Sequence, residues 1–330
     1  MQTLLWLTVA FAALPLLGVL YQWIGTWRDA RKFPPPGRLV DGLHICEMGR
    51  EMGAGNPTVL FESGIAASTV NWSVVQTAVS VFTRTVSYDR AGFGWSDAAR
   101  TPRHAGTIAE ELHALLDKAG IPGPYIFVGH SFGALIGRCY ASRWPSEIAG
   151  MVLVDPLAAA EWTDIGPEQQ NMLDRGASLS RRGGLLARIG VVRFSLNLLM
   201  AGAHVIPRVV GRAASGGGLK VADRLVGEVR KMPRELWPVV QAHWSQPKNF
   251  ESMGEHLRLL PQSAAAVDAL TMPADFPVKV LLAADANPVR RREYAVLFGE
   301  RCVDVANSGH WIQLDQPQAV VDAIREMLGT

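Results

Sequence analysis

A serine bracketed by two glycines lies where an apolar run meets a helix-like segment. Gly129-His130-Ser131-Phe132-Gly133 follows the β-prone residues Tyr125–Val128 and precedes Ala134–Arg143. The turn between strand and helix is so sharp that a Cβ atom at Gly129 or Gly133 would clash with neighbouring backbone. Ser131 is therefore expected in a strained conformation, with its hydroxyl pointing outward at the positive end of the helix. This G-x-S-x-G pattern, in its strand-to-helix context, predicts a nucleophilic serine.

β-rich runs alternate with helical patterns along much of the chain. Leu39–Met48 is expected to form a hairpin. Strands of a parallel sheet are expected at Thr58–Glu62, Thr85–Tyr88, Tyr125–Val128, Met151–Val154, Val278–Ala283 and Cys302–Val305. Helices are expected at Trp72–Val81, Thr107–Ala119, Phe132–Ser142, Arg290–Phe298 and Pro317–Leu328. The alternation predicts a mostly parallel, doubly wound α/β sheet with reactive groups at the carboxyl ends of its strands.

One long interval interrupts this alternation. From about Leu157 to Asp275 there are helical patches but no strand pattern, which predicts a helical cap (157–275) inserted into a core of residues 39–156 and 276–330. Between Arg175 and Lys231 the cap carries eleven Lys and Arg against two acidic residues, interleaved with apolar ones. Two interpretations stay open: a cap with solvated basic residues, or a basic amphipathic surface resting on anionic lipid headgroups.

The N-terminus differs from the rest in composition. No charged side chain precedes Arg28, and Leu4 to Ile24 is almost wholly apolar. Twenty-one helical residues rise about 31 Å, enough to cross the hydrocarbon core of a bilayer. A cleaved signal peptide would have positive residues before this run and a small-x-small site after it, and neither is clear. Residues 1–27 are therefore expected to be a single-pass transmembrane anchor, and residues 28–38 a basic, proline-rich spacer.

The charge pattern bears on location and partners. Lys and Arg lie on the C-terminal flank of the apolar run, which favours membrane localisation with a cytoplasmic catalytic domain. The net charge of +2 predicts no nucleic-acid partner. Three scattered cysteines predict neither a disulfide framework nor a metal cluster, and no cofactor motif is present.

A nucleophilic serine needs a base and an acid. His310, in Ser308-Gly309-His310-Trp311, follows the last expected strand and is the best placed of eight histidines to remove the serine proton. His130, although next to Ser131, is expected to point away from it. A carboxylate should hold the imidazole in the right tautomer. Asp155 and Asp285 both follow expected strands in a chain order of Ser, Asp, His, so both are candidates.

The anion formed during attack on a carbonyl also needs hydrogen-bond donors. One is expected to be the backbone amide of Phe132, which follows the nucleophile. The other is expected on the loop after Thr58–Glu62, where Gly64 permits close backbone approach and the Ile65 amide could donate. Such a pair forms an oxyanion hole, commonly the largest single contribution to catalysis.

These residues resemble the α/β-hydrolase fold superfamily over about residues 38 to 328. Besides the serine and histidine motifs, Tyr88-Asp89-Arg90-Ala91-Gly92-Phe93-Gly94-Trp95-Ser96 is similar to the loop after strand four of esterase and lipase-like members. The Phe33-Pro34-Pro35-Pro36-Gly37 spacer behind an N-terminal anchor is similar to a membrane-attached subgroup. The resemblance implies a Ser-His-acid hydrolase without a cofactor, a cap that shapes the substrate pocket, and structural roles for Asp89 and Arg90.

The resemblance also bears on the acid and on the reaction. Many relatives carry the acid after the strand that corresponds to Val278–Ala283, near a glycine that this chain lacks there. Others carry it after the preceding strand, which is the position of Asp155, and Asp155 is therefore preferred over Asp285. A serine at position 131 argues against dehalogenase and epoxide hydrolase chemistry, since both form an ester on a carboxylate.

The expected function is hydrolysis of carboxylic esters through an acyl-enzyme. The substrates would be small-molecule or lipid esters with medium or long acyl groups, reached from a membrane that the N-terminal helix and the basic cap contact. Two alternatives stay open: the same three residues acting on thioester, amide or carbon–carbon bonds or in perhydrolysis, and a non-catalytic, membrane-tethered binding protein.

Overall fold

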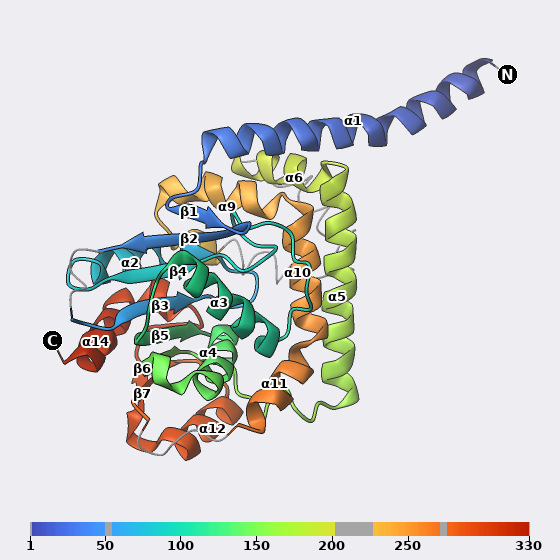
Figure 1. Ribbon diagram of the computed structural model, residues 1–330. Helices are drawn as coiled ribbons and strands as arrows, with labels where there is room; N and C mark the ends of the chain where they lie inside the picture. Colours follow the sequence, from blue (N-terminus) through green and yellow to red (C-terminus); the bar gives the residue numbers. More distant parts are fainter. Residues whose placement is uncertain (1, 50–54, 202–226, 271–275, 330) are drawn as a thin grey trace.

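The computed structural model describes residues 2–49, 55–201, 227–270 and 276–329, with side chains from residue 14 onward. Eight strands form one sheet in the order β1-β2-β4-β3-β5-β6-β7-β8 (Figure 1). Antiparallel pairing is confined to β1 with β2 and β2 with β4, and the other neighbours are parallel. The strands are β1 (Arg38–Val40), β2 (Leu43–Met48), β3 (Thr58–Glu62), β4 (Thr85–Tyr88), β5 (Tyr125–His130), β6 (Ile148–Val154), β7 (Val278–Ala283) and β8 (Cys302–Val305). This confirms the mostly parallel α/β sheet.

The central strands are longer than their apolar runs. β5 continues through Gly129 and His130, because these residues pair with Leu153 and Val154 of β6. β6 begins at Ile148, three residues before the expected start. The residues that β5 and β6 carry at their carboxyl ends therefore lie side by side at one edge of the sheet.

Helices cover both faces of the sheet. α3 (Ala105–Ala119) and α4 (Phe132–Arg143) pack together on one face, and α2 (Ser73–Val79) and α14 (Pro317–Leu328) pack together on the other (Figure 1). α2 corresponds to the helix expected at Trp72–Val81, and a 3₁₀ turn, Thr69–Trp72, precedes it. α12 (Pro288–Phe298) joins β7 to β8, and a short helix α13 (Ile312–Asp315) precedes α14. The right-handed crossovers of parallel strands place the helices in this way.

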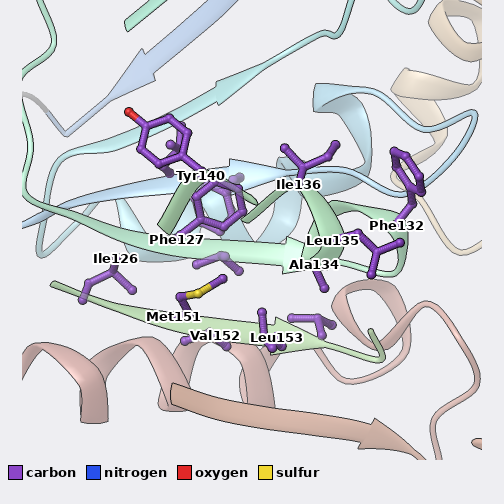
Figure 2. Close-up of a cluster of buried hydrophobic side chains, with 14 of the residues drawn as sticks. Ile126, Phe127, Phe132, Ala134, Leu135, Ile136, Tyr140, Met151, Val152 and Leu153 are labelled. Carbon is purple, nitrogen blue, oxygen red and sulfur yellow. The ribbon is translucent and has the colours of Figure 1, made fainter. Parts of the chain in front are cut away.

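Core side chains lie on both faces of the central strands, and those on one face pack against α4. Ile126 and Phe127 of β5, Met151, Val152 and Leu153 of β6, and Leu135, Ile136 and Tyr140 of α4 are at most 1% exposed (Figure 2). Gly137 of α4 permits this contact, since a Cβ there would lie 2.6 Å from the Phe127 ring. This close packing holds the start of α4 rigidly at the end of β5.

Helices alone fill the described part of the chain between β6 and β7. They are α5 (Pro167–Arg188), α6 (Val191–Met200), α9 (Trp237–Trp244), α10 (Pro247–Arg258) and α11 (Leu260–Asp268). We call them the helical insertion. α5 and α10 pack along each other (Figure 1), and Gly183 makes room there for the Phe250 ring. His204 and Asp223 and the Gly216–Gly218 run of this region lie outside the described residues.

The N-terminal residues form one helix, α1 (Gln2–Lys32), which lies across the helical insertion (Figure 1). It continues five residues past the expected end of the anchor and stops before Phe33-Pro34, since proline disfavours helix in the residue before it. The remaining spacer packs on the core: Trp95 Nε1 donates to Phe33 O at 2.9 Å, and His44 contacts Pro36 O. The spacer is thus not a free tether.

The described residues do not support the membrane crossing that was expected at the N-terminus. In the parts of the chain with described side chains, no single helix combines the length and apolar composition that a crossing requires. α5 and α6 meet both criteria only together, and the chain bends by 86° between them. The expected anchor, Leu4 to Ile24, falls partly on residues 4–13, whose side chains lie outside the described part.

Candidate active site

Ser131 occupies the strained turn that its flanking glycines predict. Its φ of 53° lies in the left-handed region, which is uncommon for a residue with a side chain. A Cβ at Gly129 would lie 2.9 Å from the backbone of Gly133 and Ala134, and a Cβ at Gly133 would lie 2.6 Å from the carbonyl oxygen of Glu62. Both glycines are therefore required by close backbone approach. Ser131 therefore lies between the carboxyl end of β5 and the first turn of α4.

Three of the expected residues form one hydrogen-bonded chain. His310 Nε2 lies 3.0 Å from Ser131 Oγ, and His310 Nδ1 lies 2.5 Å from Asp155 Oδ2. Ser131 follows β5, Asp155 follows β6, and His310 lies on the loop after β8. The imidazole is 24% exposed, while the serine and the carboxylate are buried. An imidazole in this position can accept the serine proton while its other nitrogen donates to a carboxylate.

Asp155 is held by more than the histidine. Its Oδ1 accepts from the Ala283 amide at 3.1 Å, and its Oδ2 also accepts from Arg290 NH1 at 2.6 Å. Burial by itself would raise the pKa of Asp155, but the hydrogen bond from His310 and the charge of Arg290 outweigh burial and hold that pKa below its usual value. The carboxylate therefore stays ionised at neutral pH and below.

Asp285, the other candidate acid, lies elsewhere. It is exposed on the loop between β7 and α12, and His310 Nδ1 contacts Asp155 instead. The first turn of α12 instead carries a cation, Arg290, to Asp155. The sequence analysis missed Arg290. The Asn287-Pro288 helix start after β7 was the available signal, since it places Arg290 in a first turn at the edge of the sheet.

His130, next to Ser131 in the sequence, has a structural partner on the loop that carries His310. Its Nε2 donates to the backbone oxygen of His310 at 2.8 Å, and among the described residues its Nδ1 has no hydrogen-bond partner. Burial, followed by the charge of His310, lowers the pKa of His130 to about 3. His130 is thus a neutral donor that ties the β5 turn to the loop that carries His310.

The loop after β3 passes directly beside the serine. A Cβ at Gly64 would lie 3.3 Å from Ser131 Cβ and 2.9 Å from His130 Nδ1, so only glycine allows this approach. Arg90 NH1 donates to Ser63 O at 3.1 Å, and its NH2 donates to Gly64 O. Ile65, the next residue, and Phe132 at the start of α4 therefore come from the two backbone segments that flank Ser131.

A buried charge cluster lies beneath this loop. Glu62, at the end of β3, accepts from the Tyr88 hydroxyl and lies 3.4 Å from Arg90 NH1. Burial raises the pKa of Glu62 to about 7 in spite of the Arg90 charge. Asp89 accepts from His44 and from the amides of Thr69 and Trp95, which is the tying role that the resemblance implies.

The helical insertion reaches the site through α10. His256 stacks edge-on against the Phe132 ring at 5.2 Å, and Lys248 Nζ donates to Gly94 O at 2.9 Å. These contacts join the insertion to the loop after β4 and to the residue after the nucleophile. In the described part of the chain, no group of three or more His, Cys, Asp or Glu side chains could hold a metal ion.

Comparison with known proteins points to one fold family. A family model described as the alpha/beta hydrolase fold matches residues 57–181, which include Ser131 and Asp155. An uncharacterised protein of Bacillus subtilis, YqjL, is 36% identical over 117 residues, which are 36% of this chain and 46% of that protein. The chain spans less than half the length of the first curated relatives that it matches.

Solved structures show the same fold over most of the chain. A thermophilic esterase from Thermogutta terrifontis has a TM-score of 0.54 at 19% identity, covering 87% of this chain and 93% of the esterase. The epoxide hydrolase CorEH has a TM-score of 0.61 at 17% identity, covering 88% of this chain and 97% of its own. At these identities the likeness concerns the fold. Neither structure bears on the membrane-attached subgroup.

Proposed function

Since the chain belongs to the α/β-hydrolase fold superfamily, we propose that it hydrolyses carboxylic esters with Ser131 as nucleophile, His310 as base and Asp155 as orienting acid. What supports the proposal above all is the continuous hydrogen-bonded chain from Ser131 Oγ through both nitrogens of His310 to Asp155 Oδ2. A serine hydroxyl is a poor nucleophile unless a base within hydrogen-bond reach removes its proton, and His310 Nε2 meets this condition.

The reaction would proceed in two halves. Ser131 Oγ attacks the ester carbonyl carbon as its proton passes to His310 Nε2, and the C=O electron pair moves onto oxygen. When the tetrahedral intermediate collapses, the bond to the alcohol oxygen breaks and Nε2 returns the proton to that oxygen. A water then attacks the acyl-serine by the same route, and the acid is released with Ser131 restored. Asp155 stabilises the imidazolium in both halves, and its depressed pKa keeps it ionised.

The oxyanion of each tetrahedral intermediate would be bound by the backbone amides of Phe132 and Ile65. Phe132 N belongs to the free first turn of α4, where amide groups lack intrahelical partners. Ile65 lies on the loop that Gly64 brings against Ser131, and Arg90 fixes the two preceding carbonyls. Such preorganised donors stabilise charge most when they need no rearrangement during the reaction.

The nature of residue 131 separates this reaction from that of some structural neighbours. Epoxide hydrolases form an ester on a carboxylate nucleophile, and this chain has a serine there. Thioesters, amides and carbon–carbon bonds remain alternative substrates of the same three residues.

Labelling with a fluorophosphonate probe tests the proposal. The wild-type chain should react at Ser131, and the Ser131→Ala variant should not. Hydrolysis of nitrophenyl esters of graded chain length should fall by roughly three or more powers of ten in the variant, because the nucleophile is absent. A Ser131→Ala protein that hydrolyses as fast as wild type would end this proposal. A wild-type chain that neither labels nor hydrolyses would favour the non-catalytic binding protein.

A further inference from the structure

Helix α1 packs on the helical insertion through a polar seam. Within residues 14–32, every residue is exposed except Gly18, Gln22, Gly25, Thr26 and Asp29. Their spacing places them on one face of the helix. Gly18 touches the backbone of Ile189, where a Cβ would lie 2.3 Å from the carbonyl oxygen, and Gly25 makes room for the Arg193 side chain. The seam is thus made of glycine and polar groups, the reverse of the usual buried face of a surface helix.

Arg193 of α6 is the centre of this seam. Its guanidinium donates to Gln22 Oε1 at 3.0 Å and to Asp29 Oδ2 at 2.5 Å, and it is only 6% exposed. Gln22 Nε2 in turn donates to the carbonyl oxygen of Ser245, after α9. A buried, paired guanidinium with matched acceptors defines one arrangement of the two helices, since removing either partner would leave a polar group unpaired. α1 is therefore fixed along the insertion.

The rest of the helix surface is apolar and uncovered. At about 100° per residue, the exposed large apolar side chains cover an arc of about 220°, more than half of the helix circumference. They are Leu14, Leu16, Leu17, Val19, Leu20, Tyr21, Trp23, Ile24 and Trp27, and they are between 38% and 72% exposed. Exposed apolar surface of this extent marks an interaction site.

We propose that this arc is the surface through which the protein rests on a lipid bilayer, with α1 lying along the membrane rather than across it. A partner helix would cover only a stripe narrower than this arc, whereas the acyl chains of a lipid layer can cover the whole arc. The aromatic residues Trp23 and Trp27 suit the membrane interface. Arg28, Arg31 and Lys32, all exposed, follow the arc and complement anionic headgroups.

The contacts of α1 disfavour the crossing orientation. Gly18, within the apolar run, packs on Ile189, and the neighbouring Arg188 forms an exposed ion pair with Glu251 of α10 at 2.6 Å. If α1 crossed the bilayer, this ion pair would lie at the depth of the hydrocarbon core, where charged groups are costly. When α1 lies flat, its apolar arc enters the interface while the insertion stays in water.

The position of α1 also bears on how substrates reach the site, an inference that rests on the proposed function. The insertion that contacts Phe132 through His256 is the same body that α1 would hold at the membrane. Esters dissolved in the bilayer surface would therefore be presented to the proposed site from the side of the insertion. The lipid contact itself does not depend on the reaction.

Depth measurement with fluorescent labels tests the inference. Leu16 and Trp27 are three helical turns apart on the same side of α1, about 16 Å along its axis. Single cysteines would replace each in a full-length Ser131→Ala chain whose three native cysteines are replaced by alanine, and would carry an environment-sensitive fluorophore. Val296 on α12, 81% exposed, provides the matched control site. Vesicles of phosphatidylcholine and phosphatidylserine would carry quenchers at known depths in the bilayer.

We expect the fluorophore emission to shift to the blue and the quenching depth to be equal at positions 16 and 27, and we expect no quenching at position 296. Two depths that differ by about 16 Å would mean a crossing helix and would overturn it. Absence of quenching at both positions, with dimers in sedimentation, would mean that a second copy of this chain covers the arc. If neither quenching nor dimers were observed, the apolar arc would be uncovered, and this result would also overturn the proposed lipid contact. Because the chain lacks Ser131, none of these results depends on the proposed reaction, and circular dichroism confirms folding.

Discussion

Replacing Asp155 by asparagine separates the two candidate acids. Oδ1 of Asp155 accepts from the Ala283 amide, and Oδ2 accepts from His310 Nδ1 and Arg290. An asparagine has only one acceptor oxygen, which can face either the Ala283 amide or His310 and Arg290. If its oxygen faces Ala283, its NH₂ group faces His310, whose Nδ1 must then accept. The histidine proton moves to Nε2, and Nε2 can no longer take the proton of Ser131.

The opposite orientation of the asparagine is also unfavourable. Its oxygen would then face His310 and Arg290, and its NH₂ group would oppose the Ala283 amide, donor against donor. The negative charge is lost in both orientations, so the imidazolium is not stabilised. Loss of the tautomer and charge together costs on the order of 10⁴ in kcat, which is about 5.4 kcal/mol of transition-state stabilisation. We expect this loss for Asp155→Asn.

The assay is steady-state hydrolysis of a nitrophenyl ester, with Asp285→Asn as the matched control. The control makes the same chemical change in a carboxylate that also follows a strand but is exposed, and we expect its kcat within about twofold of wild type. Urea unfolding of both variants shows whether lost activity reflects lost structure. A fully active Asp155→Asn protein beside an inactive Asp285→Asn protein would refute the reasoning.

Two further predictions concern the turn and the charge cluster beneath it. Gly133→Ala should lower the free energy of unfolding by about 1–3 kcal/mol, because its Cβ would meet backbone at 2.6 Å. Gly166→Ala, whose Cβ would have no atom of the described residues within 4 Å, should leave the free energy of unfolding nearly unchanged in urea titrations. Equal effects of these two variants would contradict the steric argument. Glu62→Gln should flatten the pH dependence of stability. In the wild type, burial raises the native pKa of Glu62 to about 7 from 4.5, so the unfolded chain releases this proton at lower pH than the folded chain does. The free energy of unfolding of the wild type should therefore fall by about 3 kcal/mol as the pH rises from 4.5 to 7. Unfolding measured across this range should show the fall in wild type relative to Glu62→Gln, and parallel curves would contradict it.

The strand-to-helix turn was predictable because it is a local feature. The glycines at 129 and 133 and the serine between them determine the backbone without reference to distant residues, and the φ of 53° at Ser131 is what such a turn requires. The strands were also predictable, because buried parallel strands are continuous apolar runs. Four of the six expected parallel strands have the expected bounds, and the other two are extended by pairing with each other.

The choice of acid needed information that no local pattern carries. β6 and β7 are neighbours in the sheet, so Asp155 and Asp285 both arrive at the same edge. They differ in direction: Asp155 has a φ of 38° and faces His310, while Asp285 is exposed. The apolar N-terminal run shows the same limit. Its composition could not reveal that Gln22 and Asp29 pair with Arg193, more than 160 residues away.

Arg290 connects the proposed acid to the start of the helical insertion. Its guanidinium donates to Asp155 and lies 3.8 Å from Glu161, which precedes α5 and also accepts from Asn287. A shift of the insertion that moves Glu161 therefore changes how Arg290 is shared between the two carboxylates. Since a carboxylate that loses part of its cation holds its proton more strongly, the ionisation of Asp155 depends on where the insertion begins. Arg290 thus links the proposed acid to the segment that precedes α5.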